Sequence, residues 1–234
     1  MKKLFIIANW KSNKTIKETE EWLHSFSDGV KRKGVNVEGK TVIVAPSFTS
    51  LEHAHYCLGN LKLSLKFAAQ DISPFDEGAH TGEVNGRQIK ELADYVIVGH
   101  SERRKNFGED EEMVNKKIEQ SLKQELTPIV CVSNIDQVQS FLRSRISLRE
   151  TKLKIIIAYE PLFAIGSGQA DTPENANSMA EKIREELGLM TVLYGGSVTS
   201  KNIKGFTQMP NIDGALVGGA SLDAQEFYAI IQNA

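Results

Sequence analysis

The sequence lacks several features that would assign it to a special class of protein. Its 234 residues include only two cysteines, Cys57 and Cys131, which lie far apart and exclude a CxxC-type zinc framework. No apolar run approaches the roughly 18 residues that a membrane-spanning helix needs. The first residues, MKKLFIIANWK, are too short for a signal-peptide core and do not end in small residues. We expect a protein of a reducing compartment with no metal, secretion signal or membrane span.

An excess of charge is also missing. The 28 Lys and Arg residues nearly balance the 30 Asp and Glu residues, and basic residues form only short clusters such as Arg103-Arg104-Lys105. The charge pattern therefore predicts no nucleic-acid partner. Hydrophobic residues make up 41% and charged residues 25%, which is typical of a folded rather than a disordered chain. Without a Gly/Ser-rich linker or a low-complexity tract, residues 1–234 are expected to form a single domain.

Short apolar runs recur along the whole sequence, and helical signals lie between them. One such signal is Thr172, a capping residue, followed by Pro173 at the first helical position. The eight runs are residues 4–8, 41–45, 65–69, 95–98, 129–132, 155–158, 191–194 and 215–217. Alternating strands and helices predict an α/β fold with a parallel sheet, either open or closed, and eight strands favour a closed (β/α)8 barrel.

Residues 155–168, which read IIIAYEPLFAIGSG, are the most informative segment. A continuous β-branched run is typical of a strand that is buried on both faces, and it places Glu160 at the strand's carboxyl end. Pro161 ends the strand, and Gly166 and Gly168 give conformational freedom to the far side of an apolar loop. The pattern predicts a catalytic base followed by a lid. A plain strand-to-helix connection with an exposed Glu160 is the alternative.

Other polar residues follow the predicted strands, at the edge where parallel α/β proteins carry their chemistry. Asn9 and Lys11 follow the first strand, and the Lys11 ammonium group is expected to face an anion at the mouth of the barrel. His100 precedes a helix that begins near Ser101 and Glu102. The N–H groups and dipole at the start of that helix disfavour a second proton on His100. A neutral imidazole of this kind can donate a hydrogen bond to a developing oxyanion.

Glycines end the last two predicted strands. Residues 195–197, Gly-Gly-Ser, follow the seventh strand, and Gly218 and Gly219 follow the eighth. Backbone N–H groups can approach an anion closely where no Cβ intervenes, so these segments are predicted to bind a phosphate group.

Cys131, which has no histidine near it in the sequence, is interpreted as a buried core thiol rather than a nucleophile.

Several of these segments together resemble the triosephosphate isomerase family. They are NWK from Asn9, VIVGHSERR from Val96, YEPLFAIGSG from Tyr159, YGGSV from Tyr194 and GALVGGASL from Gly214, in the order and spacing of that family. The resemblance covers nearly the whole sequence. It implies a TIM barrel that interconverts D-glyceraldehyde 3-phosphate and dihydroxyacetone phosphate in glycolysis and gluconeogenesis, without a cofactor or a metal. It also implies a cytoplasmic homodimer.

The resemblance also implies roles for single residues. Glu160 resembles the base, His100 the electrophile, and Asn9 with Lys11 the pair that binds substrate. Ser101 and Glu102 are expected to support them. The backbone phosphate contacts are expected at Gly166, Ser197, Gly218 and Gly219. The segment AHTGE, residues 79–83, resembles the tip of a loop that reaches the partner subunit, which places Thr81 at the dimer interface.

Two departures from the family affect the predicted lid. The family usually has Trp where this sequence has Phe163 and Glu where it has Asn134, and we expect these changes to alter the lid rather than the reaction.

Two other kinds of function stay open. A barrel that forms a Schiff base needs a lysine at a late strand end, and no strand near residues 155–217 offers one. A non-catalytic binding barrel would be expected to lose Glu160 or His100.

Overall fold

The computed structural model describes residues 2–34, 39–61, 64–143, 155–188 and 190–234. The eight predicted strands are all present, each within two residues of its predicted bounds, and they form a closed barrel in which every neighbouring pair is parallel. Their bounds are β1 Leu4–Asn9, β2 Lys40–Ala45, β3 Lys66–Ala69, β4 Tyr95–Val98, β5 Thr127–Val132, β6 Ile156–Tyr159, β7 Thr191–Tyr194 and β8 Gly214–Val217. The predicted single-domain (β/α)8 barrel is therefore confirmed.

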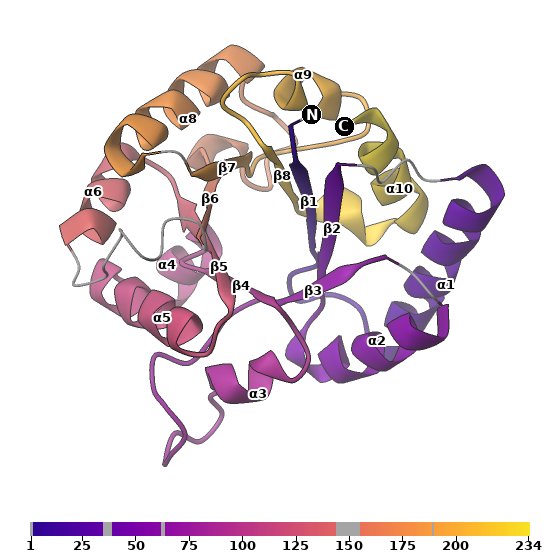
Figure 1. Ribbon diagram of the computed structural model, residues 1–234, viewed down its shortest axis with the longest axis horizontal. Coiled ribbons are helices and arrows are strands. Elements are labelled where there is room, and N and C mark those ends of the chain that lie inside the picture. Colours follow the sequence, from indigo (N-terminus) through magenta and orange to yellow (C-terminus); the bar gives the residue numbers. More distant parts are fainter. Residues whose placement is uncertain (1, 35–38, 62–63, 144–154, 189) are drawn as a thin grey trace.

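Helices surround the barrel on its outside (Figure 1). Their bounds are α1 Ile16–Lys33, α2 Phe48–Leu61, α3 Gly86–Lys90, α4 Ser101–Phe107, α5 Glu111–Lys123, α6 Ile135–Arg143, α8 Pro173–Leu187, α9 Ile203–Thr207 and α10 Ala224–Asn233, with short 3₁₀ turns η2 Leu162–Ala164 and η3 Gly219–Leu222. Local signals start several of them. Thr15 and Glu18 form a capping box on α1, and Thr172 caps α8 with Pro173 in its first turn, as predicted.

Each strand is buried on both faces, which explains its continuous apolar sequence. In β6, Ile157 packs in the layer between the strands and the helices, whereas Ile156 and Ala158 fill the barrel interior. The same alternation holds in β1, where Ile7 points inward and Ile6 outward. Because both layers are apolar, polar side chains on these strands are confined to the ends, and that is where the chemistry gathers.

Residues 70–85, between β3 and α3, form a long connection that projects from the body of the barrel (Figure 1). A cluster of charged side chains holds its first residues against α4 and α5. Asp71 contacts Lys117 Nζ at 2.6 Å and Arg103 at 2.9 Å, and Glu109 pairs with the same two cations. Lys117 and Glu109 are both buried. This cluster fixes the base of the connection, while its tip, including Thr81, is exposed.

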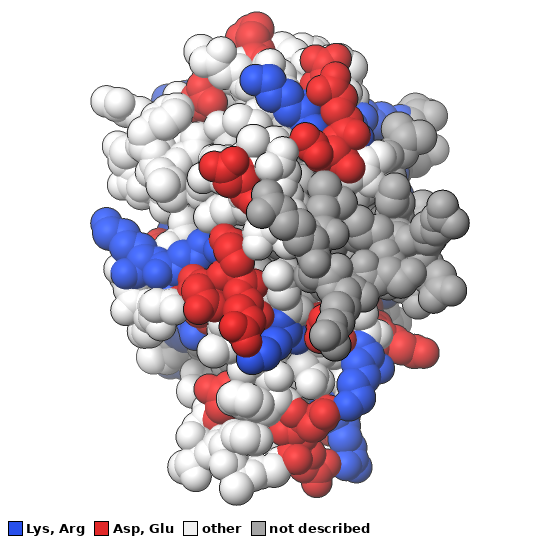
Figure 2. Space-filling model, turned by 90° about the vertical axis from the view of Figure 1, so that its left-hand side faces the viewer, with Lys and Arg blue, Asp and Glu red and all other residues white. Residues whose placement is uncertain are grey.

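The surface carries charges of both signs. On the face that Figure 2 shows, basic and acidic side chains lie interspersed, and the basic ones do not merge into a continuous area. None of the helices in the described ranges combines the length and the hydropathy that crossing a membrane requires.

Candidate active site

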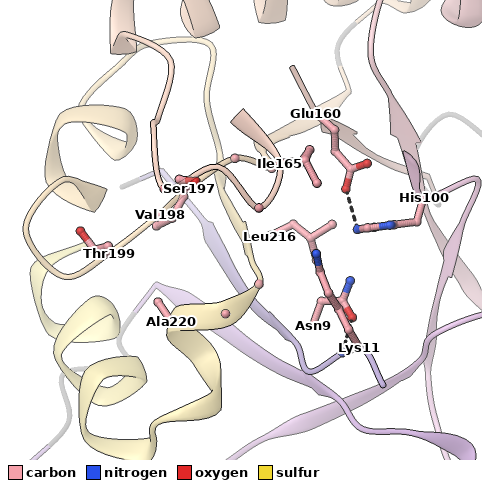
Figure 3. Close-up of a pocket in the computed structure, with 16 residues that line it drawn as sticks. Asn9, Lys11, His100, Glu160, Ile165, Ser197, Val198, Thr199, Leu216 and Ala220 are labelled. Carbon is pink, nitrogen blue, oxygen red and sulfur yellow. Dashed lines mark hydrogen bonds and ion pairs between the residues drawn. The ribbon is translucent and has the colours of Figure 1, made fainter. Parts of the chain in front are cut away.

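The carboxyl ends of the strands meet at one rim, where they surround a cavity of about 270 Å³. Most of the predicted site residues line it, although they come from distant parts of the sequence, whereas Ser101, Glu102 and Thr81 do not. Figure 3 shows Glu160 and His100 on one side of this cavity, Ser197 and Ala220 on the opposite side, and Asn9 and Lys11 at its edge. The polar lining residues are Asn9, Lys11, His100, Glu160, Ser197 and Thr199, and the glycines are Gly166, Gly168, Gly195, Gly196, Gly218 and Gly219.

Glu160 is buried directly after β6, and its carboxylate has one hydrogen bond, from Ser101, and one close contact, with His100. Ser101 N–H, at the start of α4, donates to Oε2 at 3.0 Å. The other oxygen, Oε1, lies 3.1 Å from His100 Nε2. The carboxylate is thus fixed beside the imidazole, and it has to rotate away from Ser101 to reach a molecule in the centre of the cavity.

The hydrogen bonds of His100 determine its tautomer. The backbone N–H of Glu102 donates to His100 Nδ1 at 3.2 Å, so Nδ1 is an acceptor without a proton. A neutral imidazole with this bond carries its proton on Nε2, the nitrogen that faces Glu160 and the cavity. The start of α4 therefore orients the ring through a backbone N–H, and the ring presents one N–H donor to the site.

Lys11 enters the cavity from a strained backbone. Its φ of 53° lies in the left-handed region, which side chains other than glycine adopt rarely. Asn9 Oδ1 accepts from Lys11 N–H at 3.1 Å, and the Gln70 side chain donates to the Lys11 carbonyl at 2.9 Å. The Lys11 ammonium group contacts Glu102 Oε1 at 2.5 Å. Asn9, Gln70 and Glu102 together direct this ammonium group toward the cavity.

The opposite side of the cavity consists mainly of backbone. Gly218, Gly219 and Ala220, at the start of η3, line it together with Ser197. A Cβ placed on Gly219 would meet no atom within 4 Å, so the backbone there faces open space. Ser197 Oγ donates to the Ala164 carbonyl at 2.8 Å and so joins this side to the segment that follows Glu160. Backbone N–H groups in such a turn can bind an anion.

The predicted lid begins with η2 and leaves its apolar side chains in solvent. Leu162 is 66% exposed and Phe163 62% exposed. Gly166 and Gly168 both have positive φ, at 67° and 76°, which is the conformational freedom that the sequence predicted for this segment. Exposed apolar side chains beside a polar cavity are what the predicted lid would present in an open position.

Four residues shape the site through contacts that the sequence did not reveal, although Gly195 and Gly196 were already predicted to lie in a phosphate-binding segment. A Cβ on Gly195 would lie 3.0 Å from Glu160 Cγ, and one on Gly196 would lie 2.1 Å from the Tyr194 hydroxyl. These two glycines thus make room for side chains, besides lining the cavity. The Tyr194 hydroxyl accepts from Asp171 N–H at 2.8 Å, just after the lid, and burial raises the pKa of this hydroxyl to about 12. Gln70 is the fourth, and no local pattern in the sequence marks any of these contacts.

Other candidate residues lie outside this cavity. Cys131 is buried, as predicted, and burial together with the nearby Glu160 carboxylate raises the pKa of its thiol. Asn134 Oδ1 accepts from Gln137 N–H at 3.0 Å and thereby caps the start of α6. Among the described residues, no three His, Cys, Asp or Glu side chains gather in a group that could hold a metal ion.

Comparison with known proteins assigns the family. A family model described as triosephosphate isomerase matches residues 4–234. The chain is 41% identical over 245 residues to the triosephosphate isomerase of Mesomycoplasma hyopneumoniae (strain 7448), covering all of both chains. It is 42% identical over 253 residues to that of Dehalococcoides mccartyi (strain CBDB1), covering all of this chain and 97% of the relative. Over 258 residues it is 39% identical to that of Dictyoglomus turgidum, again covering all of both. The chain therefore belongs to the triosephosphate isomerase family.

Proposed function

We propose that this chain is an aldose–ketose isomerase that interconverts D-glyceraldehyde 3-phosphate and dihydroxyacetone phosphate. One observation carries the proposal: a carboxylate, an imidazole N–H and an ammonium group face a single cavity whose opposite side is a backbone turn suited to a phosphate. Isomerisation needs a base at the reacting carbons, a hydrogen-bond donor at the oxygens and an anchor for the phosphate. The cavity offers all three from this chain's own residues.

Glu160 is the proposed base. Its carboxylate removes the proton from the carbon beside the carbonyl group, and the electron pair of that C–H bond moves toward the carbonyl oxygen to give an enediolate. The same carboxyl group then returns a proton to the neighbouring carbon, which completes the isomerisation without net gain or loss of atoms. Triosephosphate isomerase is itself the standard example of a Glu base with a neutral His electrophile, and Glu160 and His100 are the residues that fill those two roles in this chain.

His100 and Lys11 are the proposed electrophiles. The Nε2–H of His100 donates to the oxygen on which negative charge develops, and a neutral imidazole can also move a proton between the two enediolate oxygens. The Lys11 ammonium group adds a positive charge, and Asn9 orients it. Preorganised donors of this kind typically account for the largest share of rate acceleration. Ser101 and Glu102 serve as positioning residues, because their backbone N–H groups hold Glu160 and His100.

The phosphate group is proposed to bind the backbone N–H groups of Gly166, Ser197, Gly218 and Gly219. Binding there brings the lid over the substrate, since Gly166 belongs to the lid. A closed lid excludes water and holds the enediolate in a geometry that does not eliminate phosphate. A lysine that forms a Schiff base finds less support, because the lysine among the cavity-lining residues is Lys11, which follows the first strand rather than a late one.

We also propose that the chain forms a cytoplasmic homodimer through the connection at residues 70–85. Its support is a second cavity of about 270 Å³ beside Lys11, lined in part by Phe48 and Phe107, whose side chains are exposed. The projecting tip of the connection carries exposed Thr81, and Phe75 stacks on His80 at 4.3 Å. A two-fold dimer in which each tip fills the other subunit's second cavity would cover these apolar side chains.

A coupled isomerase assay on the purified chain and its Glu160→Gln variant tests the proposed function. The amide can still accept from Ser101 N–H, so the variant should fold normally. Turnover should fall by roughly 10²- to 10⁴-fold or more, because a general base has been removed, with a much smaller change in KM. Glu181→Gln, an exposed change on α8, is the matched control and should act like the parent. Turnover of Glu160→Gln within tenfold of the parent would remove Glu160 from the mechanism.

A further inference from the structure

The turn proposed to bind phosphate is held from behind by an aromatic side chain on α1. The indole N–H of Trp22 donates to the Ser221 carbonyl at 3.1 Å, a contact between residues 199 positions apart in the sequence. Both residues are buried. Ser221 lies within η3, whose first residue is Gly219, so this hydrogen bond joins α1 directly to the backbone that lines the cavity.

The η3 turn is closed by its own hydrogen bonds, and it contacts β1, α10 and the Trp22 side chain. Ser221 N–H and Ser221 Oγ both donate to the Gly218 carbonyl, at 2.8 Å and 2.7 Å. These bonds set the shape of the turn but do not attach it to the barrel. Trp22 supplies an attachment, and it is itself rigid because it stacks on Phe26 at 5.2 Å and contacts Trp10 edge-on at 4.9 Å.

We propose that Trp22 is a positioning residue for phosphate binding. Its indole N–H holds η3 where the N–H groups of Gly218 and Gly219 converge on the anion, without touching the substrate itself. The inference depends on the proposed function only for the identity of the substrate. Binding of inorganic phosphate to the turn can be measured whether or not the chain is an isomerase. Because anion binding depends on the convergence of several N–H groups, a small displacement of the turn weakens all of them together.

The chain contains two tryptophans, and the second provides a matched control. Trp10 lies in the same aromatic cluster and is fully buried, but its indole nitrogen has no hydrogen-bond partner among the described residues. Trp22→Phe and Trp10→Phe therefore delete the same atoms from one cluster. Only the first deletion breaks a hydrogen bond to the phosphate turn.

The dissociation constant for inorganic phosphate, measured by calorimetry, is the first readout. Trp22→Phe should raise it by about two- to tenfold, the effect of losing one ordinary hydrogen bond, and Trp10→Phe should leave it unchanged. KM for glyceraldehyde 3-phosphate should rise in parallel with kcat nearly constant, whereas the slow turnover of phosphate-free D-glyceraldehyde should not change. A lower melting temperature with an unchanged phosphate dissociation constant would mean that Trp22 is merely structural and would overturn the proposal.

A second measurement uses the unmodified protein and does not depend on the folding of a variant. With ¹⁵N-labelled indoles, two side-chain N–H signals are expected in the NMR spectrum. Saturation with inorganic phosphate should shift the hydrogen-bonded Trp22 signal, and an unmoved Trp22 signal would overturn the proposal. If the parent binds phosphate through this turn yet lacks isomerase activity, the proposed function fails and the role of Trp22 stands.

Discussion

At the scale of single residues, backbone N–H groups orient the two side chains that are proposed to carry out the reaction. Glu160 is fixed by one backbone N–H and His100 by another, and both belong to the first turn of α4. Backbone donors cannot be removed by a side-chain substitution and cannot rotate away. In this conformation, the start of that helix therefore sets the orientation of both the base and the electrophile.

His100 is predicted to carry its proton on Nε2 at pH 7. The reason is the Glu102 N–H, which needs an unprotonated Nδ1 as its acceptor. ¹⁵N NMR of the imidazole distinguishes the tautomers, because protonated and unprotonated ring nitrogens have well-separated shifts. His24, which is exposed on α1, serves as the internal reference. An imidazolium signal for His100 at pH 7 would contradict the assignment of His100 as a neutral electrophile.

At the scale of secondary-structure elements, the buried ion cluster connects three parts of the fold. Asp71 belongs to the projecting connection, Arg103 to α4 and Lys117 to α5. Burial raises the pKa of the Asp71 carboxyl, and the nearby Lys117 ammonium group counteracts that rise. The two cations and two carboxylates, with Glu109 as the fourth member, balance in charge. Removing one of them leaves a buried charge uncompensated.

Lys117→Met is predicted to lower the free energy of unfolding by about 3 to 5 kcal/mol, because it breaks a buried ion pair from one side. Lys116→Met is its control on the same helix. Lys116 pairs with Glu112 in solvent, where such a pair contributes little to stability. Urea denaturation of both variants measures the difference. Equal losses in the two variants would show that burial does not govern the contribution of this cluster.

The lid is the second element for which we make a prediction. Phe163 and Asn134 both depart from the family, and Phe163 has no N–H that a carboxylate at position 134 could accept. We predict that Phe163→Trp alone gains little and that adding Asn134→Glu yields a coupling of about 0.5 to 3 kcal/mol in a double-mutant cycle. Asn134 also caps α6, so Asn134→Glu alone should cost about 0.5 to 2 kcal/mol.

The double-mutant cycle separates the loss of the α6 cap from the coupling between positions 134 and 163. Asn134→Glu removes the cap both with Phe163 and with Trp at that position, so the capping loss cancels. Stability and the rate of lid opening are the quantities to measure, with all four variants in one buffer. Effects that add within error would mean that Phe163 and Asn134 do not communicate. The paired departure from the family would then be a coincidence.

The sequence predicted the strands and the residues at their ends because those signals are local. Eight short apolar runs mark β1 to β8, and burial on both faces confines Glu160 and His100 to the positions after their strands. Contacts such as Gln70 with Lys11, or Trp22 with Ser221, join residues whose proximity arises only when the barrel closes. No pattern around Trp22 distinguishes its hydrogen-bonded indole from that of Trp10, which finds no partner in the described part of the chain. The exposure of Leu162 and Phe163 and the hydrogen bond from Ser101 to the Glu160 carboxylate likewise depend on conformation, which a residue pattern does not specify.

At the scale of the whole molecule, the proposed dimer would complete each site from outside. The tip around Thr81 is exposed in the single chain, and the second cavity adjoins Lys11. An anchored Lys11 needs both Asn9 and Gln70, and Gln70 begins the projecting connection. Dimerisation is therefore expected to affect catalysis through Lys11.

Thr81→Arg is predicted to shift the chain from dimer to monomer and to lower kcat, because the arginine side chain is much larger than that of threonine and would bring a third positive charge beside Lys11 and Arg103, which line the second cavity. Ser178→Arg, an exposed change on α8, is the control and should remain a dimer. Sedimentation at micromolar concentration, together with the isomerase assay, gives both readouts. A parent chain that sediments as a fully active monomer would refute the dimer proposal.

The ring of strands closes only when β8 pairs with β1, where Phe5 faces Gly214. Because Gly214 is synthesised about 210 residues after Leu4, at about 5 to 20 residues per second β1 waits roughly 10 to 40 s for its second neighbour. During that interval the apolar edge of β1 is open to other nascent chains. Activity can begin only after the last strand has been made, so a product terminated before residue 214 should be inactive and prone to aggregate, however well its first strands fold.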